Sequence, residues 1–299
     1  MKLSTSNWLY DHDPATGRIY TPAESMGALK AAGYDSVDIN IWPMCHPGGP
    51  MTKDDWRTHI EAFAVACAEL DLPVYQTHGN TMGGTEWDDP AYPHRELRHT
   101  CTLRCAEAAR MLGADSMVLH PFNLAHAPIY SEKENQKACI AYLAPYIEAA
   151  KKAGIKVAVE NMIDFGRRHR RYCGGDIYEL IDLVETIRDP DVGICIDTGH
   201  ANISGMDPAA AIRATGKHLF ALHINDNHSK AGLDEHLLPF FGDINWQSVM
   251  TALTDVGYAG HLTYEVNPQR VPGAAGAAWL RYTVEIGRHL ISLVEDRAQ

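Results

Sequence analysis

Four short, strongly apolar runs in this chain each end in an acid or a histidine. The clearest is Val192–Asp197, which is bounded by Pro190 and Gly199. The other three are Val157–Glu160, Phe220–His223 and Leu262–Glu265. Continuous apolar runs of this length are typical of parallel strands that are buried on both faces. A charged group at the end of a buried strand needs a partner, so four such ends predict a parallel sheet whose strand ends converge on a metal ion.

Strand-like and helix-like segments alternate along the whole chain. The predicted strands are Lys2–Trp8, Tyr34–Trp42, Pro73–Thr77, Ser116–Leu119, Ile155–Glu160, Val192–Asp197, Leu219–His223 and Gly260–Glu265. The predicted helices are Pro22–Ala32, Lys53–Leu70, Pro93–Leu112, Glu132–Ala153, Asp176–Ile187, Pro208–Thr215, Trp246–Asp255 and Ala274–Val294. Eight units spaced roughly 30–40 residues apart predict an α/β fold, a single (β/α)8 TIM barrel. No linker or change in composition divides residues 1–299, so we expect one domain.

Local signals mark the ends of several predicted helices. Thr21 precedes Pro22 and is expected to cap the first helix, and Thr52 is expected to cap the second. The glycines expected to close helices are Gly33, Gly113, Gly154 and Gly257. The longest connections follow strands, at residues 43–51, 79–92, 161–175 and 224–245. Because the loops after the strands form the active face of a TIM barrel, these insertions favour an enzyme or a ligand-binding site.

The composition restricts the classes of partner. The 299 residues include 26 Lys and Arg against 38 Asp and Glu, a formal net charge of −12. An acidic chain binds nucleic acid poorly, so we expect no nucleic-acid partner. No apolar run approaches the roughly 18 residues of a membrane span, and residues 1–7 lack the apolar segment of a signal peptide. Seven cysteines without a CxxC motif indicate reduced thiols, and these features together predict a cytoplasmic protein with no membrane partner.

The charged strand ends form a candidate set of metal ligands. Its members are Glu160, Asp197, His223 and Glu265. Alternate residues of a strand share a face, so the neighbours on the ligand face are small: Ala158, Cys195, Ala221 and Thr263. Three carboxylates and one imidazole suit one divalent ion, with Mn²⁺ favoured and Mg²⁺, Co²⁺ or Zn²⁺ as alternatives. A separate ion pair for each residue is the competing interpretation, and it requires four independent partners.

The segments around these ligands resemble a known family. They are Val157–Asn161, Ile196–His200, Leu222–Asp226, Tyr264–Val266 and the loop Asp234–Trp246. They are similar to the xylose isomerase-like TIM barrel superfamily, the sugar phosphate isomerase/epimerase family that is related to apurinic endonuclease family 2. The resemblance implies that Glu160, Asp197, His223 and Glu265 hold one ion. It also implies that Glu160 and Glu265 are catalytic, that the substrate is a sugar or polyol, and that the protein is a homo-oligomer.

The chemistry of such enzymes explains a pair of carboxylates. A divalent ion beside a ketone oxygen and the neighbouring hydroxyl acidifies the C–H bond between them. One carboxylate removes that proton and leaves an enediolate. A second carboxylate, on the opposite face, returns a proton and inverts the centre. The resemblance therefore predicts a metal-dependent sugar isomerase or epimerase.

Other residues are candidates for contacts with substrate: His78, His120, His200, Asp234, His236, Trp42 and Arg167. By resemblance, the four histidines and Asp234 also occupy positions of the extra ligands in three-zinc apurinic endonucleases. Arg167 belongs to a basic run at residues 164–172, which is either an anion clamp or a solvated loop or subunit contact. Trp42, like Trp8, either stacks on a sugar ring or packs in the core.

Three further functions remain open. A lyase or dehydratase acting on a keto-sugar, an inositol or an oxidised C-glycoside uses the same enolate chemistry. The other two are a zinc-dependent apurinic endonuclease-like hydrolase and a sugar-binding barrel without activity. Two departures from the family pattern bear on the choice. Phe240 and Phe241 replace a Gly-Glu pair, and they could form an apolar lid, a contact with an aromatic substrate or a packing contact. The arginine expected soon after His223 is absent, and the basic residue in that segment is Lys230.

Overall fold

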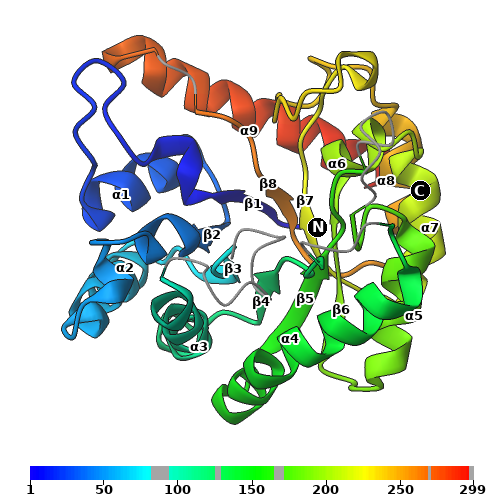
Figure 1. The fold of residues 1–299 in the computed structure, drawn as a ribbon. Coiled ribbons are helices and arrows are strands. Elements are labelled where there is room, and N and C mark those ends of the chain that lie inside the picture. Colours follow the sequence, from blue (N-terminus) through cyan, green and yellow to red (C-terminus); the bar gives the residue numbers. More distant parts are fainter. Residues whose placement is uncertain (82–93, 125–128, 165–171, 269–270, 296–299) are drawn as a thin grey trace.

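Eight parallel strands form the centre of the computed structural model, which describes residues 1–81, 94–124, 129–164, 172–268 and 271–295 (Figure 1). The strands are β1 (Leu3–Ser6), β2 (Ser36–Asn40), β3 (Val74–His78), β4 (Ser116–Leu119), β5 (Lys156–Glu160), β6 (Val192–Asp197), β7 (Leu219–His223) and β8 (Leu262–Tyr264). Their order is β7-β6-β5-β4-β3-β2-β1-β8. A parallel bridge between Ile224 and Tyr264 brings the last two edges together, so the chain is a single (β/α)8 TIM barrel.

Helices surround the strands on the outside, as Figure 1 shows. They are α1 (Pro22–Ala32), α2 (Trp56–Glu69), α3 (Arg95–Leu112), α4 (Glu132–Ala153), α5 (Ile177–Ile187), α6 (Thr198–Ile203), α7 (Pro208–Thr215), α8 (Trp246–Asp255) and α9 (Gly273–Glu295). Thr21 caps α1 in a complete capping box with Glu24, as expected. All four predicted glycines have positive φ after a helix, which is why glycine is suited to these positions.

Two predictions about local structure were wrong. Thr52 does not cap α2: it ends a 3-10 turn, Pro50–Thr52, and its hydroxyl donates to the Gly49 carbonyl, so α2 begins four residues later at Trp56. The first strand ends at Ser6 rather than Trp8. The Ser6 hydroxyl accepts a hydrogen bond from the Trp8 backbone N–H at 3.1 Å, which turns the chain into the 3-10 helix Asn7–Tyr10.

Small side chains occupy the barrel interior beneath the carboxyl ends of the strands. Val118, Ala158, Cys195 and Ala221 form a separate, fully buried cluster. Three of them are the residues that alternate with the candidate ligands, so the expected strand parity is confirmed. Because this layer is small, longer polar side chains have room above it to converge at the carboxyl end of the barrel.

The cysteines and the helices agree with the expectations from composition. All seven cysteines are buried and free of disulfide bonds. Among the helices within the described ranges, none has the length and apolar character that a bilayer crossing requires.

Candidate metal centre

The four predicted ligands meet at the carboxyl end of the barrel. Glu160, Asp197 and His223 are the last residues of β5, β6 and β7, and Glu265 directly follows β8. One ligand atom from each lies within 4.8 Å of those of the other three. Three of the side chains belong to fully buried residues, and Glu265 is 6% exposed. Parallel strands thus bring together residues that are up to 105 positions apart in the sequence (265 − 160 = 105).

The charges of this cluster fit a bound cation. The Nδ1 atom of His223 lies 2.7 Å from Glu160 Oε1 and 3.4 Å from Glu265 Oε2. Atoms bound at right angles to one ion, at about 2.2 Å, lie roughly 3 Å apart, so these separations fit shared coordination. Within the described part of the chain, histidines supply every ion-pair contact of Glu160, Asp197 and Glu265. Three buried carboxylates that have no Lys or Arg partner among the described residues favour a divalent ion.

Hydrogen bonds from a backbone N–H and from two asparagine side chains hold Asp197 in place. One oxygen accepts the His200 backbone N–H at 2.7 Å and so caps helix α6, and the other accepts Asn225 Nδ2 at 2.6 Å. The Asn161 side chain also pairs with the Asp197 backbone on both sides, at 2.6 and 3.0 Å. Burial raises the pKa of Asp197 to about 6, since desolvation disfavours the carboxylate. A bound cation would favour the charged form again.

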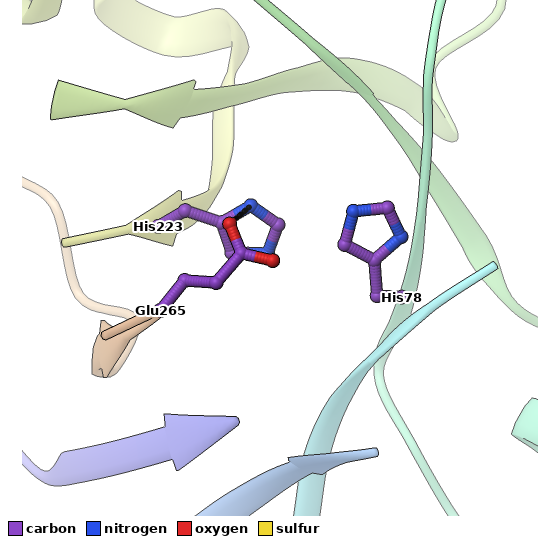
Figure 2. Close-up of side chains that lie close together, drawn as sticks. All are labelled: His78, His223 and Glu265. Carbon is purple, nitrogen blue, oxygen red and sulfur yellow. Dashed lines mark ion pairs between the residues drawn. The ribbon is translucent and has the colours of Figure 1, made fainter. Parts of the chain in front are cut away.

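Two histidines from neighbouring strands face the second oxygen of Glu160. His78 Nε2 lies 3.3 Å and His120 Nε2 3.0 Å from Glu160 Oε2. The rings of His78 and His223 stack, with centroids 5.2 Å apart, and Figure 2 shows His78 facing His223 and Glu265. Burial acts to raise the pKa of Glu160, but the neighbouring histidines hold it well below the ordinary value. Glu160 is therefore a carboxylate at neutral pH.

A second cluster lies beside the first, at the rim. Asp234 Oδ2 is 3.4 Å from His200 Nε2 and 3.1 Å from His236 Nε2. His236 Nδ1 pairs with the Glu265 carbonyl at 2.8 Å, which ties this cluster to the four-ligand cluster. Burial acts to lower the pKa of His236, but Asp234 outweighs it and raises that pKa to about 9. The edge of Trp8 packs on His236, with ring centroids 5.6 Å apart.

The remaining predicted site residues lie in different surroundings. Trp42 opens a 3-10 helix after β2 and packs against His46, and it belongs to none of the ligand groups. Arg167 and most of the basic run lie outside the described residues. Phe240 and Phe241 are each 47% exposed and contact Trp246, His289, Trp279 and Tyr282. These rings belong to α8 and α9, which favours the packing interpretation of the phenylalanine pair.

Several residues at the site have no clear signal in the sequence. Helix α6 was not predicted, because six residues are too few for a helical period, although an acid before Thr-Gly-His is a capping signal. Asn161 directly follows Glu160, and Asn225 is two residues after His223, but the hydrogen bonds of both asparagines to Asp197 appear only in the folded chain. Asp38 and Gln76 lie on the inner face of β2 and β3, beneath the cluster.

Comparison with known proteins identifies the family of the chain. The model of the xylose isomerase-like TIM barrel family matches residues 26–283, so the chain belongs to that family. An uncharacterised protein of Mycobacterium leprae is 27% identical over 87% of this chain and 90% of its own length. A D-psicose 3-epimerase of Enterocloster bolteae is 28% identical, over 46% of this chain and 42% of its own. An inosose isomerase of Halalkalibacterium halodurans is 24% identical over 45% of this chain and 48% of its own length.

Solved structures share the fold. A D-tagatose 3-epimerase-like protein superposes with a TM-score of 0.78 and 22% identity, over the full length of both chains. The apo form of 3-keto-D-glucoside 4-epimerase from E. coli gives a TM-score of 0.73 and 19% identity, over 97% of this chain and 99% of that one. At these identities the likeness establishes the barrel architecture and its topology.

Proposed function

We propose that this protein is a sugar isomerase or epimerase that depends on one divalent metal ion and abstracts a proton next to a carbonyl group. One observation carries the proposal. Glu160, at the end of β5, and Glu265, directly after β8, approach the same nitrogen of His223 in a buried cluster that also contains Asp197. Two carboxylates at one cation site are what inversion of a carbon centre requires. Relatives named as a D-psicose 3-epimerase and an inosose isomerase support this substrate class.

The chain's own residues have separate tasks in this proposal. Glu160, Asp197, His223 and Glu265 would hold the ion, whose charge polarises a carbonyl and an adjacent hydroxyl when it is bound. Glu160, which is unprotonated at neutral pH because its histidine neighbours lower its pKa, would accept the proton from carbon. Glu265, 6% exposed at the rim, donates or accepts on the other face. His120, His200 and Asp234 would bind sugar hydroxyl groups around the pair.

Solvent exchange tests the proposal directly. The metal-free protein is reloaded with Mn²⁺, Mg²⁺, Co²⁺ or Zn²⁺ and incubated in D₂O with ketohexoses, inososes and 3-keto-glycosides. The expected result is deuterium at the carbon next to the carbonyl together with a change of stereochemistry or carbonyl position. Glu160→Gln and Glu265→Gln should each lower the exchange rate by at least about 100-fold, because general acid–base catalysis contributes 10²–10⁴-fold.

Matched controls separate catalysis from folding. Glu107→Gln removes a carboxylate of an exposed ion pair with Arg57, and exchange should be unchanged. Loss of water or of an aglycone from a keto substrate, instead of exchange at constant mass, would identify a lyase. Absence of metal binding by the native protein after reconstitution would refute the shared-ion argument.

A second candidate function rests on the two neighbouring groups of histidines. Two groups, His78 with His120 and His200 with Asp234 and His236, extend the four-ligand cluster to nine potential ligands. That number suits three zinc ions, and a hydrolase acting on apurinic DNA is the corresponding activity. Elemental analysis decides between the candidates: about one ion per chain supports the sugar enzyme. About three zinc ions per chain, together with cleavage of an abasic-site oligonucleotide, would support the hydrolase instead of the sugar enzyme.

A further inference from the structure

A buried carboxylate that belongs to none of the predicted sets lies beneath the cluster. Asp38, on β2, has no exposed surface. Its Oδ2 atom accepts a hydrogen bond from Gln76 Nε2 at 3.1 Å, and its Oδ1 atom has no hydrogen-bond partner among the described residues. Leaving such an oxygen unpaired costs stability, so a carboxylate at this position needs a further role or a further partner.

The nearest complementary group belongs to a predicted metal ligand. His223 Nε2 lies 3.4 Å from Asp38 Oδ2, and within the described chain it too makes no hydrogen bond of good geometry. The contact is long, but hydrogen bonds in ligand-free sites are often long and shorten when the ligand binds. A small rotation of the imidazole would give His223 Nε2 an acceptor and would give Asp38 Oδ2 a second donor beside Gln76.

We infer that Asp38 is a positioning residue: it accepts the Nε2 proton of His223 and thereby directs the bare Nδ1 atom at Glu160 and Glu265. An imidazole can coordinate a metal only through a nitrogen without a proton. In the metal-free chain Nδ1 is hydrogen-bonded to Glu160 at 2.7 Å and lies 3.4 Å from Glu265. An ion bound between these groups would require Nδ1 without a proton, so the remaining ring proton would be on Nε2. This inference rests on the proposed function, in which His223 is a ligand. It adds the group that selects which nitrogen binds.

The surroundings of Gln76 determine what a substitution at position 38 would do. Gln76 Nε2 also donates to the Leu222 carbonyl at 3.4 Å, and Gln76 Oε1 accepts from the Thr263 hydroxyl at 3.4 Å. The amide is therefore oriented with its N–H₂ towards residue 38. An asparagine there would turn its own oxygen towards Gln76 and His223, whereas a leucine would offer no acceptor.

The test reads the proton on His223 directly. Protein labelled with ¹⁵N-histidine is studied by NMR without metal and with Zn²⁺, a diamagnetic probe, and His223 is assigned with His223→Gln. With Zn²⁺ bound, native protein should carry the ring proton on Nε2, donated to Asp38. Asp38→Asn should keep that Nε2 signal, and Asp38→Leu should shift it, because the proton then has no acceptor. Zn²⁺ affinity, measured by competition with a chelator, should fall 10–100-fold in Asp38→Leu and less in Asp38→Asn.

Each outcome separates the inference from the proposed function. Ser36→Ala removes a hydrogen bond to His261 on the same face of β2, farther from the cluster, and should change neither readout. An unchanged Nε2 proton and unchanged Zn²⁺ affinity in Asp38→Leu would overturn the inference and leave the metal site intact. If native protein binds no metal, the proposed function fails, while an Nε2 signal of metal-free protein that shifts in Asp38→Leu but not in Ser36→Ala still assigns Asp38 as the partner of His223. Loss of stability in both Asp38 variants with the proton unmoved assigns Asp38 a structural role only.

Discussion

Replacing Asp226 with asparagine should destabilise the loop that carries Asp234 and His236. Asp226 is fully buried and accepts four hydrogen bonds. Its Oδ1 atom accepts the backbone N–H groups of Asn227 at 2.9 Å and Ile244 at 3.2 Å. Its Oδ2 atom accepts the Phe240 N–H at 3.0 Å and the Trp246 indole N–H at 2.8 Å.

The magnitude follows from the donors that would be left unpaired. Asparagine turns one of the two acceptor oxygens into a donor, so two N–H groups lose their acceptor whichever way the amide points. Hydrogen bonds to a charged acceptor contribute about 1.5–3 kcal/mol each, so the loss of two should lower the unfolding free energy by roughly 3–6 kcal/mol. This is a large part of the 5–15 kcal/mol that is typical of a domain.

Urea unfolding followed by circular dichroism measures this loss. Asp243→Asn is the matched control, since Asp243 lies in the same loop and accepts from Asn202 and Ser229 at an exposed position. It should cost less than about 1 kcal/mol. If the unfolding free energy of Asp226→Asn lies within about 1 kcal/mol of that of native protein, the view that this carboxylate anchors the loop is refuted.

Three further predictions concern the site. The raised pKa of His236, about 9 against 6.5 unfolded, means that its protonated form stabilises metal-free protein fully below pH 6.5. That contribution, at most about 3 kcal/mol, is lost as the pH rises to 9. The unfolding free energy, measured by urea titration at pH 6.5 and at pH 9, should therefore change less with pH in His236→Gln than in native protein. Gly199→Ala would place a Cβ 1.9 Å from Asn225 Oδ1, so it should lower Mn²⁺ affinity measured by calorimetry. Gly27→Ala on α1, where a Cβ meets no atom within 4 Å, should leave it unchanged. Glu160→Gln should lower Mn²⁺ affinity at least about 10-fold in the same assay, and equal affinity would exclude Glu160 as a ligand.

Local sequence was sufficient for most of the barrel. The bounds of β4, β6, β7, α1, α4, α7 and α8 are those predicted, because an apolar period, a cap or a closing glycine marks each end. Errors arose where a competing turn was available, as at Thr52, where a proline begins a 3-10 turn before the helix. Helix α6 was missed because its six residues are too few to show a helical period, although Asp197 caps it in the structure.

The four candidate ligands followed from sequence because each is the end of a strand, and parallel strands in one barrel place their carboxyl ends together. The residues that hold those ligands did not. Asp197 depends on Asn225, 28 positions away, and His223 lies against Asp38, 185 positions away (223 − 38 = 185). Neither partner has a local pattern that distinguishes it from an ordinary polar residue of a strand or loop.

The sequence by itself determined the class of fold, the strand parity and the identity of the charged strand ends, since these depend on periods of two and 3.6 residues. Only the tertiary structure decided which oxygen faces which nitrogen, that Phe240 packs on α8 and α9, and that Asp38 lies beneath His223. The reason is physical. Periodicity is a property of neighbours along the chain, whereas a hydrogen bond depends on distances of about 3 Å between strands that meet only after the barrel closes.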